Sequence, residues 1–190
     1  MLKYKLIFIL LVFGLLSCQP INILDKKVYD YDNLPKLLMY GQEKKINNLY
    51  DSNFTEPYID HSLDNPPINY LNLWFDNNIN LMGNNNLLQI NILDASLKRS
   101  EIKNLDAKHY DDKMIFLFEI NFLVEFVLYD DVNTVLASSI VETKRTVTSS
   151  KYISILESEI IINNLISDAM MDFSLKSNEL IKIHMKNYII

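Results

Sequence analysis

Cysteine, glycine and histidine are scarce in this chain, and each scarcity excludes a class of site. The single cysteine, Cys18, cannot form an intramolecular disulfide or join a multi-thiolate metal site. Three glycines are too few for a phosphate-binding Gly-rich loop, and the Gly-x-Ser-x-Gly motif of serine hydrolases is absent. The three histidines, His61, His109 and His184, fall in different predicted elements without metal-ligand spacing. We therefore expect no metal and no cofactor.

Positive charge is also in short supply. The chain has 18 lysines and arginines against 24 aspartates and glutamates. Removing residues 1–17 would take away Lys3 and Lys5 and no acid, so the net charge of -6 would become -8. An acidic chain binds nucleic acid and anionic lipid headgroups poorly. We expect no nucleic-acid partner and no membrane contact through a basic face.

The N-terminal segment has the pattern of an export signal. Lys3 and Lys5 charge its start, and a short apolar run extends from Leu6 to Leu16. This run is too short to span a bilayer, and Gln19 and Pro20 end it. The alternatives are a transmembrane anchor and a plain signal peptide with an incidental cysteine. The anchor would need a longer apolar run, and an incidental thiol would be exposed without a disulfide partner.

The sequence Leu15-Leu16-Ser17-Cys18 resembles the lipobox of bacterial lipoproteins, although Leu16 is larger than the usual residue. The resemblance implies cleavage before Cys18, diacylglycerol on its sulfur and an acyl chain such as palmitate on the new N-terminus. Two or three acyl chains anchor a protein almost permanently. The resemblance therefore implies a periplasm-facing protein held on a membrane by lipid. Gln19 is not the aspartate linked to inner-membrane retention, which favours the outer membrane.

The chain after the signal has the length of one domain with a single core. Residues 18–44 mix prolines, a glycine and scattered charges without a sustained period, which predicts a lipid-anchored tether and irregular lead-in. Residues 45–190 are then a single domain. We expect an α+β fold, with an antiparallel sheet of three to four strands and two helices packed mainly on one face.

Periodicity places the elements of this domain. The expected strands alternate apolar and polar residues and span 46–51, 88–95, 114–129 and 135–148. The expected helices have apolar residues at three- and four-residue spacing; one spans 67–82, with Gly83 just past its end, and one starts near Ser154 and passes a kink at 174–177. Residues 52–66 and 96–112 are predicted to be loops.

Aromatic side chains offer a candidate ligand site. An apolar cavity between helices and sheet would be lined by Trp74, Phe75, Phe116, Phe118 and Phe122. Aromatic residues at regular spacing are equally typical of a packed core. Tight packing of these rings without a void would favour the core interpretation.

Acidic residues do not form an obvious catalytic pair. Glu119 and Glu125 share one strand face but lie about 20 Å apart at roughly 3.3 Å per residue. A cleft in which His61 meets Asp60 or Asp64 would instead support an enzyme.

Several features follow one another along the domain in a fixed order: Pro57-Tyr58-Ile59-Asp60-His61, Pro66-Pro67, the Trp74 helix, the run from Ile90 to Ser96, the strand hairpin and the terminal helix. In this order the chain resembles small uncharacterised lipoproteins of alphaproteobacteria over about residues 35–190. In layout, as a small α+β domain on a lipid tether, it is also similar to auxiliary lipoproteins of envelope transport systems, such as the lipopolysaccharide-assembly lipoprotein and auxiliary subunits of lipid transporters.

These observations give three functional hypotheses. The first is a non-enzymatic accessory or assembly subunit of an envelope system, which holds a protein partner at the membrane through a mixed strand face, an exposed sheet edge or the Phe-rich region. The second is a small-ligand carrier in the periplasm, with lipid as its cargo. The third is a hydrolase or other enzyme.

Overall fold

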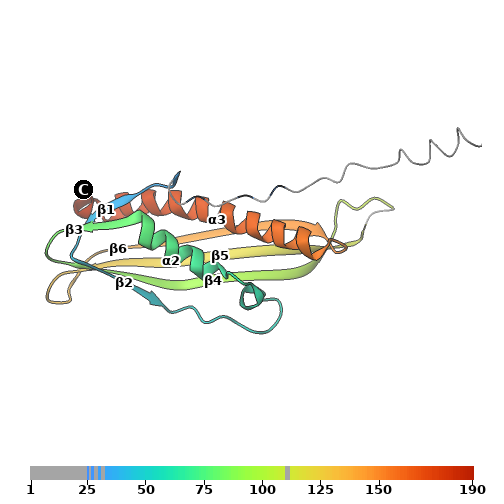
Figure 1. The fold of residues 1–190 in the computed structure, drawn as a ribbon, viewed down its shortest axis with the longest axis horizontal. Helices are drawn as coiled ribbons and strands as arrows, with labels where there is room; N and C mark the ends of the chain where they lie inside the picture. Colours follow the sequence, from blue (N-terminus) through green and yellow to red (C-terminus); the bar gives the residue numbers. More distant parts are fainter. Residues whose placement is uncertain (1–24, 26, 28–29, 31–32, 110–111) are drawn as a thin grey trace, which may run out of the picture.

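A computed structural model describes residues 25, 27, 30, 33–109 and 112–190. The two long helices lie on the same face of a sheet of long strands (Figure 1), so the predicted α+β fold is confirmed. The elements are β1 (Leu37–Tyr40), β2 (Glu43–Asn48), η2 (Asp60–Ser62), α2 (Pro67–Asn78), β3 (Ile79–Met82), β4 (Leu87–Lys103), β5 (Met114–Tyr129), β6 (Val135–Ser150), α3 (Ile155–His184) and η3 (Lys186–Tyr188).

The main sheet has the strand order β2-β4-β5-β6. β4, β5 and β6 are antiparallel neighbours, as their alternation and the turn after Tyr129 predict. β2 runs parallel to β4, with Ile46 beside Ile90. The sheet is therefore mixed, and the prediction of a purely antiparallel sheet is corrected for β2. The chain passes from β2 to β4 through α2, and a helical crossover of this kind returns the strand in the same direction.

A second, two-stranded sheet did not follow from the sequence pattern. β1 pairs parallel with β3, with Leu37 beside Ile79. The N–H of Ile190 donates to β1 from its other side. β1 lies inside segment 18–44, the predicted tether and lead-in, yet its Leu37 and Met39 are buried in the same core as the helices. Four residues are too few for alternation to reveal a strand.

Helix α2 begins at Pro67 as predicted but ends at Asn78, earlier than the apolar spacing indicates. Ile79 continues that spacing and instead starts β3. The Nζ of Lys44 on β2 donates to the carbonyls of Phe75 and Ile79 at 2.6 and 3.1 Å. The ammonium thus satisfies carbonyl groups at the end of the helix. This contact comes from a distant strand, which helical periodicity cannot detect.

Strand β4 is longer than predicted and occupies the first half of the expected loop 96–112. It stays in register with β5 as far as Lys103, with a bulge between Ile92 and Asp94. The bulge shifts the alternation by one residue, so that Ile92 and Ala95 both face the core. This irregular alternation is the reason that the sequence pattern indicates a strand end near Ala95.

Helix α3 is continuous from Ile155 to His184, without the predicted kink at 174–177. Ser174 and Ser177 are fully buried in it. The hydroxyl of Ser174 donates to the carbonyl of Met171 within the helix. These serines therefore belong to the packed face of a regular helix.

The N-terminus of α3 is closed by a capping box. The Oγ of Ser154 accepts from the N–H of Glu157 at 3.2 Å, and the Glu157 carboxylate accepts from the N–H of Ser154 at 2.8 Å. The N–H and the hydroxyl of Ser154 both donate to this carboxylate and lower the pKa of Glu157. A capping serine of this kind contributes more than its exposed position suggests.

We expect Ser154→Ala to lower the free energy of unfolding by about 1 kcal/mol, because it leaves N–H groups of the first turn without an acceptor. Urea denaturation measures this change. Ser158→Ala is the matched control, since Ser158 lies inside the helix and should tolerate alanine. Equal losses in the two variants would contradict the capping role of Ser154.

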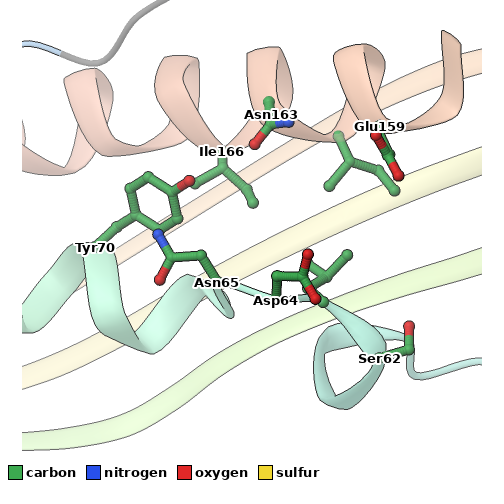
Figure 2. A pocket seen from close by; sticks show the side chains of 9 residues that line it. Ser62, Asp64, Asn65, Tyr70, Glu159, Asn163 and Ile166 are labelled. Atoms are coloured by element: carbon green, nitrogen blue, oxygen red, sulfur yellow. The ribbon is translucent and has the colours of Figure 1, made fainter. Parts of the chain in front are cut away.

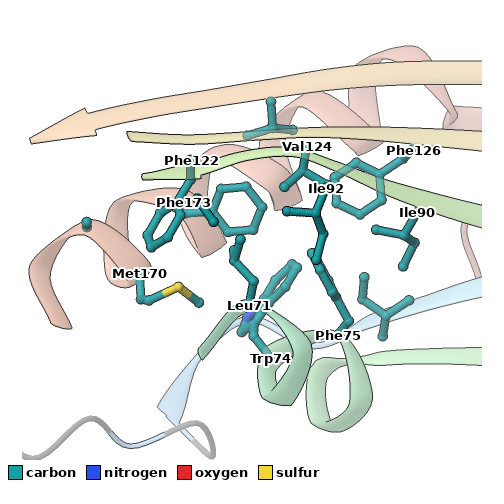
Figure 3. Packing of buried hydrophobic residues seen from close by; sticks show 14 of the residues in the cluster. Leu71, Trp74, Phe75, Ile90, Ile92, Phe122, Val124, Phe126, Met170 and Phe173 are labelled. Carbon is teal, nitrogen blue, oxygen red and sulfur yellow. The ribbon is translucent and has the colours of Figure 1, made fainter. Parts of the chain in front are cut away.

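The core lies between the helices and the sheet (Figure 3). Phe173 of α3 packs edge-on against three rings, with centroid distances of 5.4 Å to Trp74, 6.3 Å to Phe75 and 5.9 Å to Phe122. Phe75 also contacts Phe126 at 6.0 Å. The cluster joins α2, α3 and β5. Both helices therefore pack on one face of the sheet, and its opposite face is turned away from them.

Candidate functional site on the open face of the sheet

The predicted site residues fall into three groups. Cys18 lies outside the described residues, and its lipidation stays a prediction. Four of the five aromatic candidates, Trp74, Phe75, Phe118 and Phe122, are fully buried in the core. None of these four lines any of three surface clefts that border α3. Phe116 is only partly buried and lines one of them.

The face of the sheet turned away from the helices is a candidate surface, and we call it the open face. Strand β5 runs through the middle of this face. Its side chains alternate between the buried face and the open face. Its even-numbered residues from Phe118 to Phe126 are fully buried, whereas Leu117, Leu123 and Glu125 on the open face remain partly exposed. Figure 1 shows α2 and α3 together on the other side. No helix of the described part of the chain covers the open face.

One hydrogen-bond network on the open face is centred on Asn91. Its Oδ1 accepts from Asn47 at 2.9 Å and from Gln89 at 3.0 Å, and its Nδ2 donates to the Glu125 carboxylate at 2.8 Å. The network thus links β2, β4 and β5. It fixes the orientation of a carboxylate that is still partly exposed.

A second network lies beside the first. The Asp94 carboxylate accepts from the N–H of Ser96 and from the Nδ2 of Asn121, both at 2.8 Å. Farther along, Lys144 pairs with Glu119 at 2.7 Å. These polar groups are therefore held in place by hydrogen bonds and an ion pair.

Apolar side chains alternate with these polar groups across the strands. Leu123 lies between Asp94 and Glu142, and Ile140, which is 56% exposed, lies beside Glu125. Exposed apolar residues among preorganised polar groups are the composition of protein–protein interfaces. Preorganisation also reduces the entropy lost on binding. The open face therefore combines exposed apolar side chains with polar groups that are already hydrogen-bonded.

A cleft of about 360 Å³ lies between the loop before α2 and the first half of α3 (Figure 2). Asp64 and Glu159 face it from these two elements, and Ile166 contributes to its apolar part. No basic residue is among its lining residues. Neither carboxylate makes an ion pair with a described residue. The cleft is acidic and open.

The histidine–carboxylate site that would support an enzyme does not form around His61. His61 is exposed, and its ring lies 5.2 Å from that of Phe54. Within the described residues it makes no hydrogen bond with Asp60 or Asp64. Across the described ranges, no group of three or more His, Cys, Asp or Glu side chains could hold a metal ion.

Asp60 is instead buried and pairs with the partly buried Tyr50. Asp60 is 1% exposed, and its Oδ2 accepts from the Tyr50 hydroxyl at 3.0 Å. Its Oδ1 has no partner among the described residues. Burial, reinforced by the Asp60 charge, raises the pKa of Tyr50 above its ordinary value. This pair holds the loop before α2 against the strands.

A second cleft, of about 330 Å³, lies at the N-terminal end of α3. Phe116 lines it, with the Arg99 guanidinium 5.0 Å and the Lys151 ammonium 5.8 Å from the ring centroid. Lys151 also pairs with Glu101 at 2.7 Å. Sequence reasoning missed both cations, because only the register of β4 with β5 and β6 brings them to Phe116. This cleft thus combines an aromatic surface with two cations, and the Glu159 carboxylate also lines it.

The described part of the chain contains no helix of the length and apolarity that crossing a membrane requires. The apolar segment from Leu6 to Leu16 lies outside the described residues. The predicted attachment through lipid on Cys18 therefore stays a prediction.

No known protein-family model and no curated protein matches the sequence. Among solved structures, a minor lipoprotein from Acinetobacter baumannii aligns with a TM-score of 0.41 and 11% identity over 77% of this chain and 92% of that chain. The rare lipoprotein B from Shewanella oneidensis aligns with a TM-score of 0.39 and 13% identity over 75% and 97%. At this identity the likeness concerns the fold alone. The resemblance to alphaproteobacterial lipoproteins stays a prediction.

Proposed function

We propose that this chain is a lipoprotein, anchored through Cys18 and facing the periplasm, that acts as a non-enzymatic accessory or assembly subunit of an envelope system. The observation that carries the proposal is the open face of the sheet. Leu123 and Ile140 stand there among polar side chains that are already hydrogen-bonded. A surface of this composition stabilises a complex when a partner covers it.

The anchor and the docking surface serve the same role. Acylation at Cys18 would hold the chain on the membrane, and a domain with net negative charge would add little electrostatic attraction to anionic lipids. The domain would then present its open face to a protein of the same membrane or of the periplasm. Gln19 after the acylated cysteine favours the outer membrane as the site of attachment.

A pull-down of the full-length lipoprotein from detergent-solubilised membranes tests this proposal. Copurifying proteins and extracted lipids are both identified by mass spectrometry, and Cys18→Ser is analysed in parallel. We expect a stoichiometric protein partner with the wild type, and loss of acyl chains and of membrane attachment in Cys18→Ser. Recovery of no stoichiometric partner protein would contradict the accessory role.

The alternative, a small-ligand carrier for lipid, is favoured by one observation. Phe116 lines a cleft in which Arg99 and Lys151 approach its ring, so an amphiphile with an anionic headgroup would find both an aromatic surface and positive charge. In the same pull-down, bound lipid without a protein partner would support this alternative. Arg99→Gln should then lower the amount of bound lipid, whereas Lys103→Gln, a charge change outside the cleft, should not.

A further inference from the structure

The lead-in segment before β1 is attached to helix α3. The backbone N–H of Lys27 donates to the Oδ1 of Asn164 at 2.8 Å, and the Nδ2 of Asn164 donates to the carbonyl of Asp25 at 3.1 Å. The Lys27 ammonium pairs with the Asp168 carboxylate at 2.6 Å, and the guanidinium of Arg145 on β6 lies 3.6 Å from the same carboxylate. Asp25 and Lys27 are therefore held on α3, and we call these two residues the strap.

The strap limits the reach of the lipid anchor. Asp25 follows Cys18 by seven residues, and seven residues span at most about 25 Å in any conformation. The first buried residue of the described chain is Leu34, which follows Cys18 by sixteen residues. Without the strap, the chain up to Leu34 could span about 55 Å. A lipid on Cys18 would therefore hold α3 close to the membrane only because the strap is in place.

The side of α3 that carries the strap also exposes apolar side chains. Met171, Leu175 and Lys182 follow Asn164 at spacings of seven, four and seven residues, which places them along one face of the helix. Ile183 lies beside this row. Met171 is 46% exposed, Leu175 52% and Ile183 60%. We call Met171, Leu175, Lys182 and Ile183 the outer face of α3.

The charges around the outer face suit a lipid surface, although the chain as a whole is acidic. From residue 175 onward the lysines outnumber the acids; these residues are Lys176, Lys182 and Lys186 against Glu179. In the preceding turns, Asp168 and Asp172 are already paired with Lys27 and Arg145. Lysines beside apolar residues are typical of helices that lie in the membrane interface. The composition of the whole chain does not reveal this local excess of lysine.

The opposite orientation, with the open face on the membrane, would need almost the whole reach of the anchor. The open face lies beyond both the helix layer and the sheet (Figure 1). Each of these layers is about 10 Å thick. The chain in front of the strap would also have to pass around the edge of the sheet. A segment of at most about 25 Å reaches the lipid far more readily on the α3 side.

We infer that the outer face of α3 rests on the membrane that carries the lipid anchor, so that the open face is turned away from this membrane. Met171, Leu175 and Ile183 then reach the boundary between headgroups and acyl chains, and the Lys182 ammonium lies at the headgroup phosphates. The anchor keeps this face at high local concentration near the lipid, so a small apolar area suffices. The inference rests on the proposed function, because it requires the acylated Cys18.

Quenching by labelled lipids at two introduced thiols tests this orientation. Cys18 is the only cysteine and is acylated in the proposed lipoprotein, so Leu175→Cys or Ile140→Cys provides the only free thiol. The two positions have similar exposure, 52% on the outer face of α3 and 56% on the open face. The lipoprotein, labelled at this thiol with a fluorophore, is reconstituted in phosphatidylethanolamine and phosphatidylglycerol vesicles that contain a nitroxide phospholipid. We expect quenching about five-fold stronger at position 175 than at position 140, because only the former lies at the lipid.

A variant without the strap contacts tests the part played by the tether. Lys27→Ala combined with Asn164→Ala removes the ion pair to Asp168 and both hydrogen bonds of Asn164. The tether then lengthens from seven to sixteen residues, so we expect quenching at position 175 to fall by about two- to three-fold. Asn163→Ala changes the neighbouring asparagine of α3 and should leave the quenching unchanged. Equal quenching with and without the strap contacts would contradict the inference.

The outcomes distinguish a failure of this inference from a failure of the proposed function. Equal quenching at positions 175 and 140, with a stoichiometric protein partner in the pull-down, would overturn the inference and leave the accessory role intact. Stronger quenching at position 140 would place the open face on the membrane and contradict both. A wild-type protein whose Cys18 carries no acyl chain by mass spectrometry would also reject both the inference and the proposed anchor.

Discussion

Replacing Phe173 with alanine is expected to lower the free energy of unfolding by about 3–5 kcal/mol, the cost of deleting a buried aromatic ring from a packed core. The ring contacts Trp74 and Phe75 of α2 and Phe122 of β5, all of them fully buried. Its removal leaves a cavity at the junction of three elements. The expected loss is a large part of the total stability of a typical domain.

Urea denaturation followed by tryptophan fluorescence measures this loss directly, because Trp74 is the only tryptophan and its ring lies 5.4 Å from that of Phe173. Phe173→Leu is the matched control and should cost clearly less, since leucine fills part of the space. A loss below about 1 kcal/mol for Phe173→Ala would mean that the rings border a void. That result would support the ligand pocket lined by aromatic residues that the sequence predicts.

The second large effect is expected from Tyr50→Phe, at about 2–3 kcal/mol. The change removes one oxygen and leaves the Asp60 carboxylate, which is 1% exposed, without its hydrogen-bond donor. A buried polar group without a partner retains its full desolvation cost. Asp60→Asn in the Tyr50→Phe background should recover part of the loss, because an amide carries no net charge. Equal stability of wild type and Tyr50→Phe would show that the hydroxyl contributes nothing to the loop.

The pair of Tyr50 and Asp60 also predicts that the free energy of unfolding depends on pH in the alkaline range. The unfolded chain loses the phenolic proton near its ordinary pKa of about 10, whereas burial and the Asp60 charge hold the pKa of Tyr50 higher in the folded chain. Above that pH the unfolded state binds fewer protons than the folded state, so this stabilising contribution decreases as the pH rises. Tyr50→Phe lacks the contribution, and the stability difference between the two proteins should narrow above about pH 10. Urea midpoints measured from pH 8 upward test this.

The sequence predicts the parts of the fold that consist of long periodic segments with a clear turn or cap at their ends. Strand β5 has the predicted bounds, and Ser154 marks the start of α3 as expected. Elements fixed by contacts distant in sequence escape prediction. α2 ends where Lys44 of β2 reaches the carbonyls of Phe75 and Ile79, and no local pattern encodes that contact.

For the candidate sites too, the local sequence pattern predicts some features and contacts distant in sequence decide the others. Alternation along β5 predicts a mixed face, and Leu123 and Glu125 do lie on the partly exposed side. It does not predict which polar groups of neighbouring strands meet there, because the bulge after Ile92 changes the register. Arg99 and Lys151 likewise lie near Phe116 because of strand pairing, which their spacing in the sequence does not indicate.

The central claim is that the open face of the sheet binds a protein partner, and site-specific photo-crosslinking in living cells tests it most directly. A photoreactive amino acid replaces Leu123 on the open face or, as the control, Met171, which is 46% exposed on α3. We predict one discrete crosslinked protein from position 123 and none from position 171. Crosslinking from position 171 alone, or from neither position, would contradict the claim.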